Sequence, residues 1–284
     1  MKKYLILLLG VASCNLVTKD KNNSGVSDNI EITKLTSNDS VRVRGYIEKS
    51  FSTPLHSLEH QQYLDSALAI QPDNAWLWQQ KAMPLYKARK YQLGKPFLAK
   101  AVAHDPKKWL DYSGFMKCIF SKDYLNSITD LIKAKNEYGD SYVMDHTYNF
   151  YIGLDYLQLN EFNKAKEFLV KSKEQQFKDF PNALPQEACH YLDWYYSGIA
   201  DFELGNYQEA IVSFDMALKG YDNFADALYF KGRSMTKLGN VEEGVEWEKK
   251  AFENGDNSFN EDNAIYEIYP YQVFHKLNES VRPK

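Results

Sequence analysis

The sequence predicts an all-α solenoid built from antiparallel helix pairs, and three observations lead to that prediction. Two segments match each other at an offset of 34 positions, pairing Gly198 with Gly232, Gly205 with Gly239, Asn206 with Asn240 and Ala217 with Ala251. Each segment has the apolar spacing of a helix, a short turn and a second helix, and a period of about 34 residues is typical of helical repeats. With 14 Gly and 9 Pro, the chain has too few turn residues for an all-β fold, although 15% of it is aromatic.

Small and large residues are spaced as closely packed helices require. Gly198 and Ala210 let two backbones approach each other, and the rings between them fill the remaining space. Gly205 suits the left-handed conformation that ends a helix, and Asn206 can begin the next helix as its cap. Because neither helix of a pair can bury its apolar stripe alone, the array needs more than two repeats.

This pattern resembles the consensus of the tetratricopeptide repeat, which runs large, small, turn, aromatic, small, aromatic, small. The matching residues are Trp194, Gly198, Gly205, Tyr207, Ala210, Phe214 and Ala217. The resemblance implies a right-handed superhelix, a protein or peptide partner in a concave groove, and neither a cofactor nor catalysis. Mild acidity, with 34 basic and 38 acidic residues, argues against a nucleic-acid partner.

Equivalent positions elsewhere in the chain extend the solenoid over residues 41–284. Pro84 departs from the pattern, because a proline inside a first helix removes a hydrogen bond and bends the axis. A terminal element is expected to cover the last apolar face. The predicted segments are a degenerate N-terminal repeat at 41–72, repeats at about 73–106, 107–140, 145–178, 186–222 and 223–256, and a C-terminal capping helix at 261–278.

Residues 1–13 are predicted to be a lipoprotein signal peptide. Two lysines precede an apolar run, Tyr4 to Leu9, that is far shorter than the roughly 20 residues needed to span a bilayer. Val11-Ala12-Ser13-Cys14 resembles the lipobox of bacterial lipoproteins, which implies acylation of Cys14 and stable attachment to a membrane, with the outer membrane as the expected location. A plain secretory signal with a chance cysteine is the alternative.

Residues 14–40 are predicted to be a flexible tether, because they are rich in Asn, Ser, Thr, Lys and Asp and lack a helical period. Two readings of the next stretch stay open. The runs Ile30 to Ile32 and Val41 to Arg44 alternate and could pair as strands, or Ser40 could cap a helix that ends near Ser50.

Cys118 and Cys189 are predicted to be small packing residues in first helices rather than a disulfide. A nucleophile pair of Cys189 with His190 is not expected, since neighbours on a helix point in different directions.

Residues at helical steps along the first helix of each pair are predicted to line a groove that binds the partner. They are Trp76, Met83, Tyr86 and Lys87; Trp109, Tyr112, Met116 and Phe120; Phe150, Leu154 and Leu157; Tyr195, Ile199 and Phe202; Tyr229, Arg233 and Lys237. Rigid rings give a large contact area at low entropic cost, which suits a peptide or an amphipathic helix. The alternative is that many of these rings are interior packing or lie under the terminal helices.

Two other functions compete with an interaction scaffold. A glycan-binding lipoprotein could stack Trp76, Trp109 and Tyr112 on sugar rings. A zinc hydrolase is the remote alternative, because the string His56 to His60 matches the HxxEH motif of inverted zinc peptidases, with Glu59 as base. Those peptidases use a third, distant carboxylate and a larger domain, whereas repeats fill this chain almost completely. The sequence therefore predicts an interaction scaffold in the bacterial envelope, without enzymatic activity or a bound metal.

Overall fold

The structure is a computed structural model that describes residues 36–259 and 266–275. The predicted signal peptide, the lipobox and Cys14 lie outside the described residues. Contacts divide the chain into two units, Met1–Thr36 and Ser37–Lys284, and the second unit holds all the described helices. Among the described residues, none of the helices combines the length and the apolar character that a membrane crossing needs.

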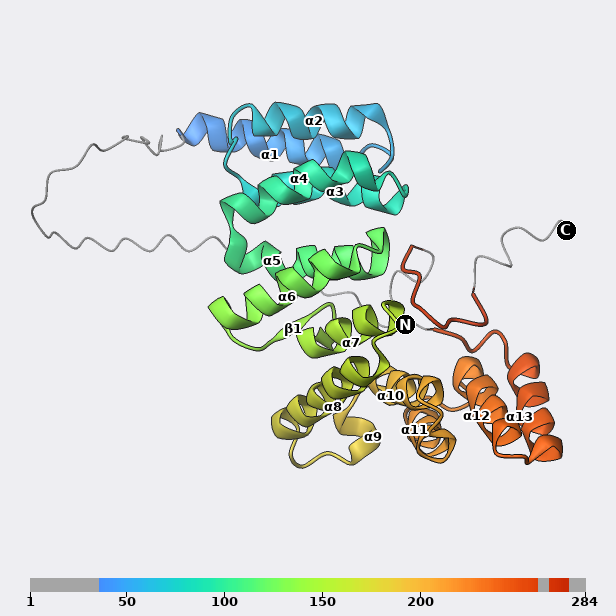
Figure 1. The fold of residues 1–284 in the computed structure, drawn as a ribbon. Coiled ribbons are helices and arrows are strands. Elements are labelled where there is room, and N and C mark those ends of the chain that lie inside the picture. The colour runs from blue at the N-terminus through green and yellow to red at the C-terminus, as the bar shows by residue number, and fades with distance from the viewer. Residues whose placement is uncertain (1–35, 260–265, 276–284) are drawn as a thin grey trace, which may run out of the picture. The chain divides into compact units, whose positions relative to one another are not determined.

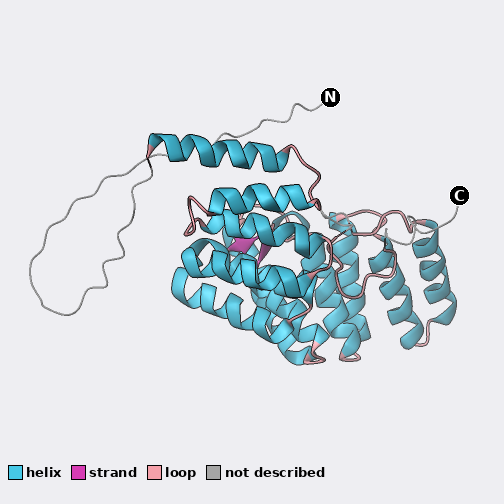
Figure 2. Ribbon diagram, turned by 90° about the horizontal axis from the view of Figure 1, so that it is seen from above, coloured by secondary structure: helices cyan, strands magenta, loops and turns pink. Residues whose placement is uncertain are grey.

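Helices make up most of the described part of the second unit, which also holds one small pair of strands (Figure 2). The elements are α1 Ser37–Phe51, α2 Leu58–Leu68, α3 Ala75–Lys87, α4 Tyr91–His104, α5 Pro106–Phe115, the π-helix η1 Met116–Ser121, α6 Tyr124–Tyr138, β1 Tyr142–Val143, β2 His146–Thr147, α7 Tyr148–Gln158, α8 Phe162–Asp179, α9 Pro185–Ala188, α10 Tyr191–Glu203, α11 Tyr207–Gly220, α12 Ala225–Lys237 and α13 Val241–Glu253.

The long helices pack in sequential pairs that stack on one another, which confirms the predicted all-α solenoid of antiparallel helix pairs. The pairs are α1 with α2, α3 with α4, α5 with α6, α7 with α8, α10 with α11 and α12 with α13. Each pair also contacts the next one. For example, α2 contacts α3 and α11 contacts α12 (Figure 1). We call α3, α5, α7, α10 and α12 the first helices, and α4, α6, α8, α11 and α13 the second helices.

Glycines set the close approach within the pairs. A Cβ atom on Gly198 would lie 2.6 Å from the ring of Phe214, so only a residue without a side chain fits beside that ring. Gly205 has a φ of +79°, the left-handed conformation predicted for the end of α10. The cap prediction for Asn206 is wrong in its chemistry, since its side chain accepts no backbone N–H and instead donates to Asp201 Oδ1 at 3.3 Å.

The N-terminal boundary of the solenoid differs from the prediction. Helix α1 begins at Ser37, so the last four residues assigned to the tether are helical and Ser40 lies inside the helix rather than capping it. The strand alternative for Val41 to Arg44 is wrong. The reason is packing, because Val43 on this helix is buried against α2 and α3 in a small cluster of its own.

The C-terminal end of the solenoid also differs. The capping helix predicted at 261–278 is wrong for residues 266–275, which form turns and irregular backbone, while 261–265 and 276–278 lie outside the described residues. Pro270 supplies the physical cause, because it lacks an N–H and disfavours the helical conformation of the residue before it. We call residues 266–275 the C-terminal segment. Its first residue, Tyr266, lies near Lys87 of α3, Tyr271 lies against α10, and Phe274 lies near Phe252 of α13, so the segment runs back toward α13 (Figure 1).

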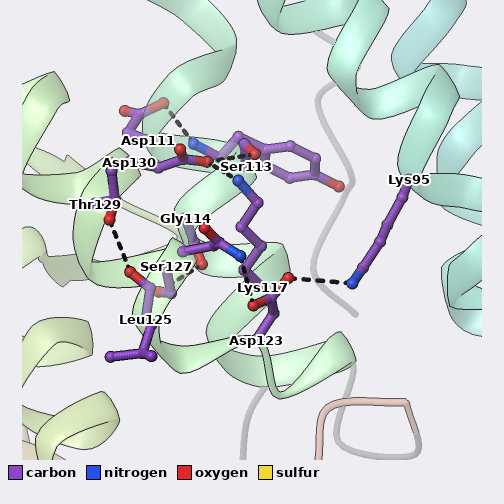
Figure 3. Close-up of polar contacts among 12 residues, drawn as sticks. Lys95, Asp111, Ser113, Gly114, Lys117, Asp123, Leu125, Ser127, Thr129 and Asp130 are labelled. Carbon is purple, nitrogen blue, oxygen red and sulfur yellow. Dashed lines mark hydrogen bonds and ion pairs between the residues drawn. The ribbon is translucent and has the colours of Figure 1, made fainter.

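Polar side chains fix the third pair at the point where α5 passes into η1. Figure 3 shows Lys117 of η1 pointing at Asp130 of α6, at 2.5 Å, and Lys95 of α4 reaching Asp123 at 3.1 Å. The π-helix ends at Lys122, whose φ of 56° is left-handed. Nothing in the sequence marked this wider turn, because its residues have an ordinary helical pattern.

Both described cysteines are buried free thiols, which confirms that they do not form a disulfide with each other. Their placement differs from the prediction, since Cys118 lies in η1 and Cys189 is the residue that ends α9. Burial raises the pKa of the Cys118 thiol well above its usual value and that of Cys189 to about 12, so both stay protonated at neutral pH.

Candidate functional site

The predicted groove residues lie on the first helices and on η1, and they fall into three classes of exposure. Half-buried side chains are those of Trp76, Met83, Lys87, Tyr112, Phe202 and Tyr229. Exposed side chains are those of Arg233 and Lys237. Buried side chains are those of Tyr86, Trp109, Met116, Phe120, Phe150, Leu154, Leu157, Tyr195 and Ile199. We call the half-buried and exposed sets together the first-helix face.

The groove assignment is therefore wrong for the nine buried residues, whose side chains cannot contact a partner in this structure. One cause is packing against the second helices. A Cβ atom on Gly94 of α4 would lie 2.7 Å from the ring of Tyr86, which shows that this ring fills the space within its own pair. Phe120 meets the same ring edge-on at 6.2 Å. Helical spacing placed these residues on the correct helices but could not distinguish the two sides of each helix.

The other cause of burial is the C-terminal segment, which lies against α10. Tyr195 Oη donates a hydrogen bond to the Tyr271 carbonyl at 2.7 Å, and Tyr196 Oη donates to the Pro270 carbonyl at 2.8 Å. The ring of Phe259 lies 5.7 Å from that of Tyr195, which is fully buried. Part of the surface that the sequence assigned to a partner is thus covered by this chain itself.

Asp226, in the first turn of α12, anchors the same segment. Its Oδ1 accepts the backbone N–H groups of Val273 at 2.5 Å and Phe274 at 3.3 Å, and its Oδ2 accepts Ser258 Oγ at 2.7 Å. Burial raises the pKa of the Asp226 carboxyl to about 6, although these three hydrogen bonds act in the opposite direction. No local pattern marks this residue, because its partners lie 32 to 48 positions away.

The contacts of the segment continue toward the N-terminal pairs. Lys122, which follows η1, donates a hydrogen bond from Nζ to the Ile268 carbonyl. The ammonium of Lys87 on α3 lies 5.0 Å from the centre of the Tyr266 ring, within the range of a cation–π interaction. The C-terminal segment therefore touches side chains from α12, α10 and α3 and from Lys122 after η1, and α12, α10 and α3 each carry residues of the first-helix face.

Solved structures show the same arrangement of helices, whereas no family model and no curated protein matches the sequence. PilW, a type IV pilus biogenesis factor, aligns with a TM-score of 0.60 at 16% identity, covering 78% of this chain and 94% of PilW. A tetratricopeptide repeat protein from Parabacteroides merdae gives 0.59 at 14% identity, covering 75% and 80%. PilF of Pseudomonas aeruginosa gives 0.55 at 18% identity, covering 74% and 90%.

The fold is that of tetratricopeptide-repeat proteins. At these identities the likeness establishes the fold and leaves the function to be argued from the site. Within this tetratricopeptide-repeat solenoid, the first-helix face and the C-terminal segment upon it form the candidate functional site.

The zinc motif does not assemble. His56 lies before α2 and is exposed, whereas His60 lies in the first turn of α2 and is buried, with Nδ1 at 2.8 Å from the Ser50 carbonyl. Ser57 between them is the N-cap that accepts the His60 N–H. The helix thus begins inside the motif, so the two histidines do not share a helical face as the prediction required.

Among the described residues, His146, His190 and Asp193 form a group whose ligand atoms lie within 4.8 Å of one another and that could hold a metal ion. Two observations favour a buried polar network instead. The Leu192 N–H donates to His190 Nδ1 at 3.3 Å, which makes that nitrogen an acceptor and places the neutral ring's proton on Nε2. Asp193 is fully buried and accepts Ser172 Oγ; burial raises its pKa and His146 lowers it.

The glycan alternative loses one of its three rings. Trp109 is 8% exposed and meets the ring of Tyr112 edge-on at 5.5 Å, so its face is not available for stacking on a sugar. Trp76 is half-buried and packs near Phe51 of α1, at 6.2 Å between ring centres.

Proposed function

We propose that this protein is a scaffold that binds an extended segment of another protein on its first-helix face. The observation that carries the proposal is that the C-terminal segment already lies against Lys87 and Tyr229 of this face. Its backbone is also hydrogen-bonded to side chains on α10 and α12 and to Lys122 after η1. A surface that satisfies the backbone of one non-helical segment is chemically suited to another.

The half-buried residues of the face indicate where contacts with a partner would contribute most to the binding free energy. Met83 and Tyr112 present apolar and aromatic surface between the N-terminal pairs, and Arg233 and Lys237 add exposed positive charge on α12. Partly exposed rings and flexible thioethers supply contact area, while the charges favour a partner with acidic groups. We propose that binding is the whole activity of the chain and that it carries out no chemistry.

We further propose that the scaffold is attached to a bacterial membrane through acylated Cys14 and that it acts in the cell envelope, with the outer membrane as its location. Support comes from the Val11 to Cys14 pattern. Replacing Cys14 with Ser should abolish metabolic labelling by a fatty acid and move the protein from the membrane fraction to the soluble fraction. Unchanged labelling and fractionation would show that Cys14 is not the anchor.

The binding proposal is tested by photo-crosslinking in the native cell. A photoreactive residue placed at Met83 or at Tyr229 should crosslink the protein to a partner, because both side chains belong to the first-helix face. Matched controls are Leu93 on α4 and Val212 on α11, which are exposed apolar residues on second helices. The proposal fails if the first-helix probes crosslink no more than the controls do.

A further inference from the structure

The C-terminal segment is held mainly by hydrogen bonds between its backbone and side chains of the solenoid. The carbonyl groups of Ile268, Pro270 and Tyr271 accept from Lys122, Tyr196 and Tyr195. Further along the segment, the amide groups of Val273 and Phe274 donate to Asp226. Five backbone groups of a ten-residue stretch are thus satisfied by side chains from three other elements.

Backbone recognition of this kind is how a protein holds a peptide. Buried backbone groups of an intrinsic structural element are usually paired within a helix or sheet, whereas residues 266–275 form neither. Side chains that bond to carbonyl and amide groups select a backbone path rather than one sequence. The same contacts would therefore accept a segment from another chain.

Aromatic rings provide the selective part of the contact. Tyr269 stacks on Phe259 with ring centres 5.5 Å apart, and Tyr271 lies 6.0 Å from Phe230 of α12. The proline between these two tyrosines restricts the backbone on either side of it and so holds both rings at fixed positions along the segment. The surface is thus suited to a segment with two aromatic residues that flank a proline.

We propose that residues 266–275 are an internal ligand of the first-helix face, and that a partner segment with aromatic residues flanking a proline replaces them on binding. This inference rests on the proposed scaffold function and deepens it, since it names both the chemistry of the partner segment and the contact that regulates its access.

Covalent connection gives the internal ligand an advantage over any free competitor. A segment covalently joined to its site competes at an effective concentration on the order of millimolar. The apparent Kd of a free segment rises by the inverse of the fraction of molecules whose site is vacant. Weakening the internal segment should therefore tighten the binding of a free peptide, with no change to the surface that binds it.

The experiment uses a fluorescent peptide with the sequence of residues 266–275 and the full-length chain. Anisotropy should show weak binding to the wild-type chain and binding at least about tenfold tighter to the double variant Tyr269→Ala, Tyr271→Ala, because its own segment has lost both rings. A peptide that carries the same two alanines serves as the control and should bind neither chain.

A matched receptor variant separates the binding surface from the segment. Adding Tyr195→Phe and Tyr196→Phe to the double variant keeps the rings of α10 and removes the two hydroxyl donors. Peptide affinity should then fall about tenfold, since each hydrogen bond to a carbonyl contributes measurably to binding. Equal affinity of wild-type and double-variant chains, with helicity retained in both, would overturn the proposal.

Limited proteolysis of the wild-type chain tests the proposal without depending on the folding of a variant. Chymotrypsin cleaves after Tyr and Phe, which recur in the segment. Cleavage should occur first within residues 266–275 while the helices stay intact, and an excess of the free peptide should accelerate it by displacing the segment. Cleavage of the segment only together with the helices would show a permanent element and overturn the proposal. Neither result depends on whether the cellular partner is found by crosslinking.

Discussion

Single residues decide how closely the helices of this protein approach and how the C-terminal segment is held. Gly198 leaves room for the ring of Phe214, and Asp226 gathers three hydrogen bonds in a buried position. The role of Gly198 depends on the absence of a side chain, and the role of Asp226 depends on its carboxyl group. Substitutions at these positions should therefore have specific, measurable effects on stability.

Gly198→Ala should lower the free energy of unfolding by about 1–3 kcal/mol, because the new methyl group would overlap the Phe214 ring within a fully packed pair. Gly45→Ala is the matched control. Its Cβ atom would meet nothing within 4 Å, and replacing a helical glycine with alanine stabilises by about 0.5–1 kcal/mol. Urea unfolding of both variants checks the prediction, which fails if the two substitutions change stability in the same direction.

The raised pKa of Asp226 predicts that the free energy of unfolding depends on pH. Its folded pKa of about 6 lies above the ordinary value of 3.8, so the native state binds more protons than the unfolded state between those two pH values. The Asp226 contribution to the free energy of unfolding should thus fall, by about 3 kcal/mol in all, as pH rises from below about 4 to above about 6.

The isosteric variant Asp226→Asn isolates that contribution. An amide oxygen can still accept from the Val273 and Phe274 N–H groups, but the side chain no longer titrates. The stability of the variant relative to wild type should increase across this pH range and then level off. Parallel stability curves from pH 4 to pH 7 would show that Asp226 has no raised pKa in the native protein.

Helix pairs are joined to each other by a recurring arrangement around a buried lysine. Lys231 of α12 contacts Asp215 of α11 at 2.6 Å and lies 3.6 Å from the centre of the Trp247 ring on α13. Lys81 of α3 repeats this pattern with Asp65 of α2 and the Phe97 ring on α4, and in both cases the acid precedes the lysine by 16 positions. One ammonium thus connects three successive helices.

Removing Asp215 should lower the free energy of unfolding more than removing Lys231 does. Asp215→Ala leaves the ammonium of Lys231, whose side chain is 9% exposed, without its carboxylate, and should destabilise by about 1–3 kcal/mol. Lys231→Met keeps the volume against Trp247 and leaves behind an aspartate that water can reach, so its effect should be below about 1 kcal/mol. Thermal unfolding distinguishes them, and a larger loss for Lys231→Met would contradict the arrangement.

At the scale of the whole molecule, the sequence predicted the fold better than it predicted the site. The solenoid follows from local signals, since Gly205 and Gly239 mark equivalent turns and both have the expected positive φ. The accessible surface does not follow from local signals. Tyr195 is buried by residues more than 60 positions downstream, and helical spacing contains no information about such contacts. The irregular path of the C-terminal segment was hidden for the same reason, although Pro270 argued against a helix there.

The central question for the whole molecule is whether the C-terminal segment can leave the first-helix face while the solenoid stays folded. Hydrogen exchange of the full-length wild-type chain, followed by mass spectrometry, measures this directly, since local opening and global unfolding expose amides with different free energies. Amides of residues 266–275 should exchange through a local opening, clearly faster than those of α10 and with little dependence on denaturant. Exchange of the segment and of α10 at the same rate and with the same denaturant dependence would contradict an exchangeable internal ligand.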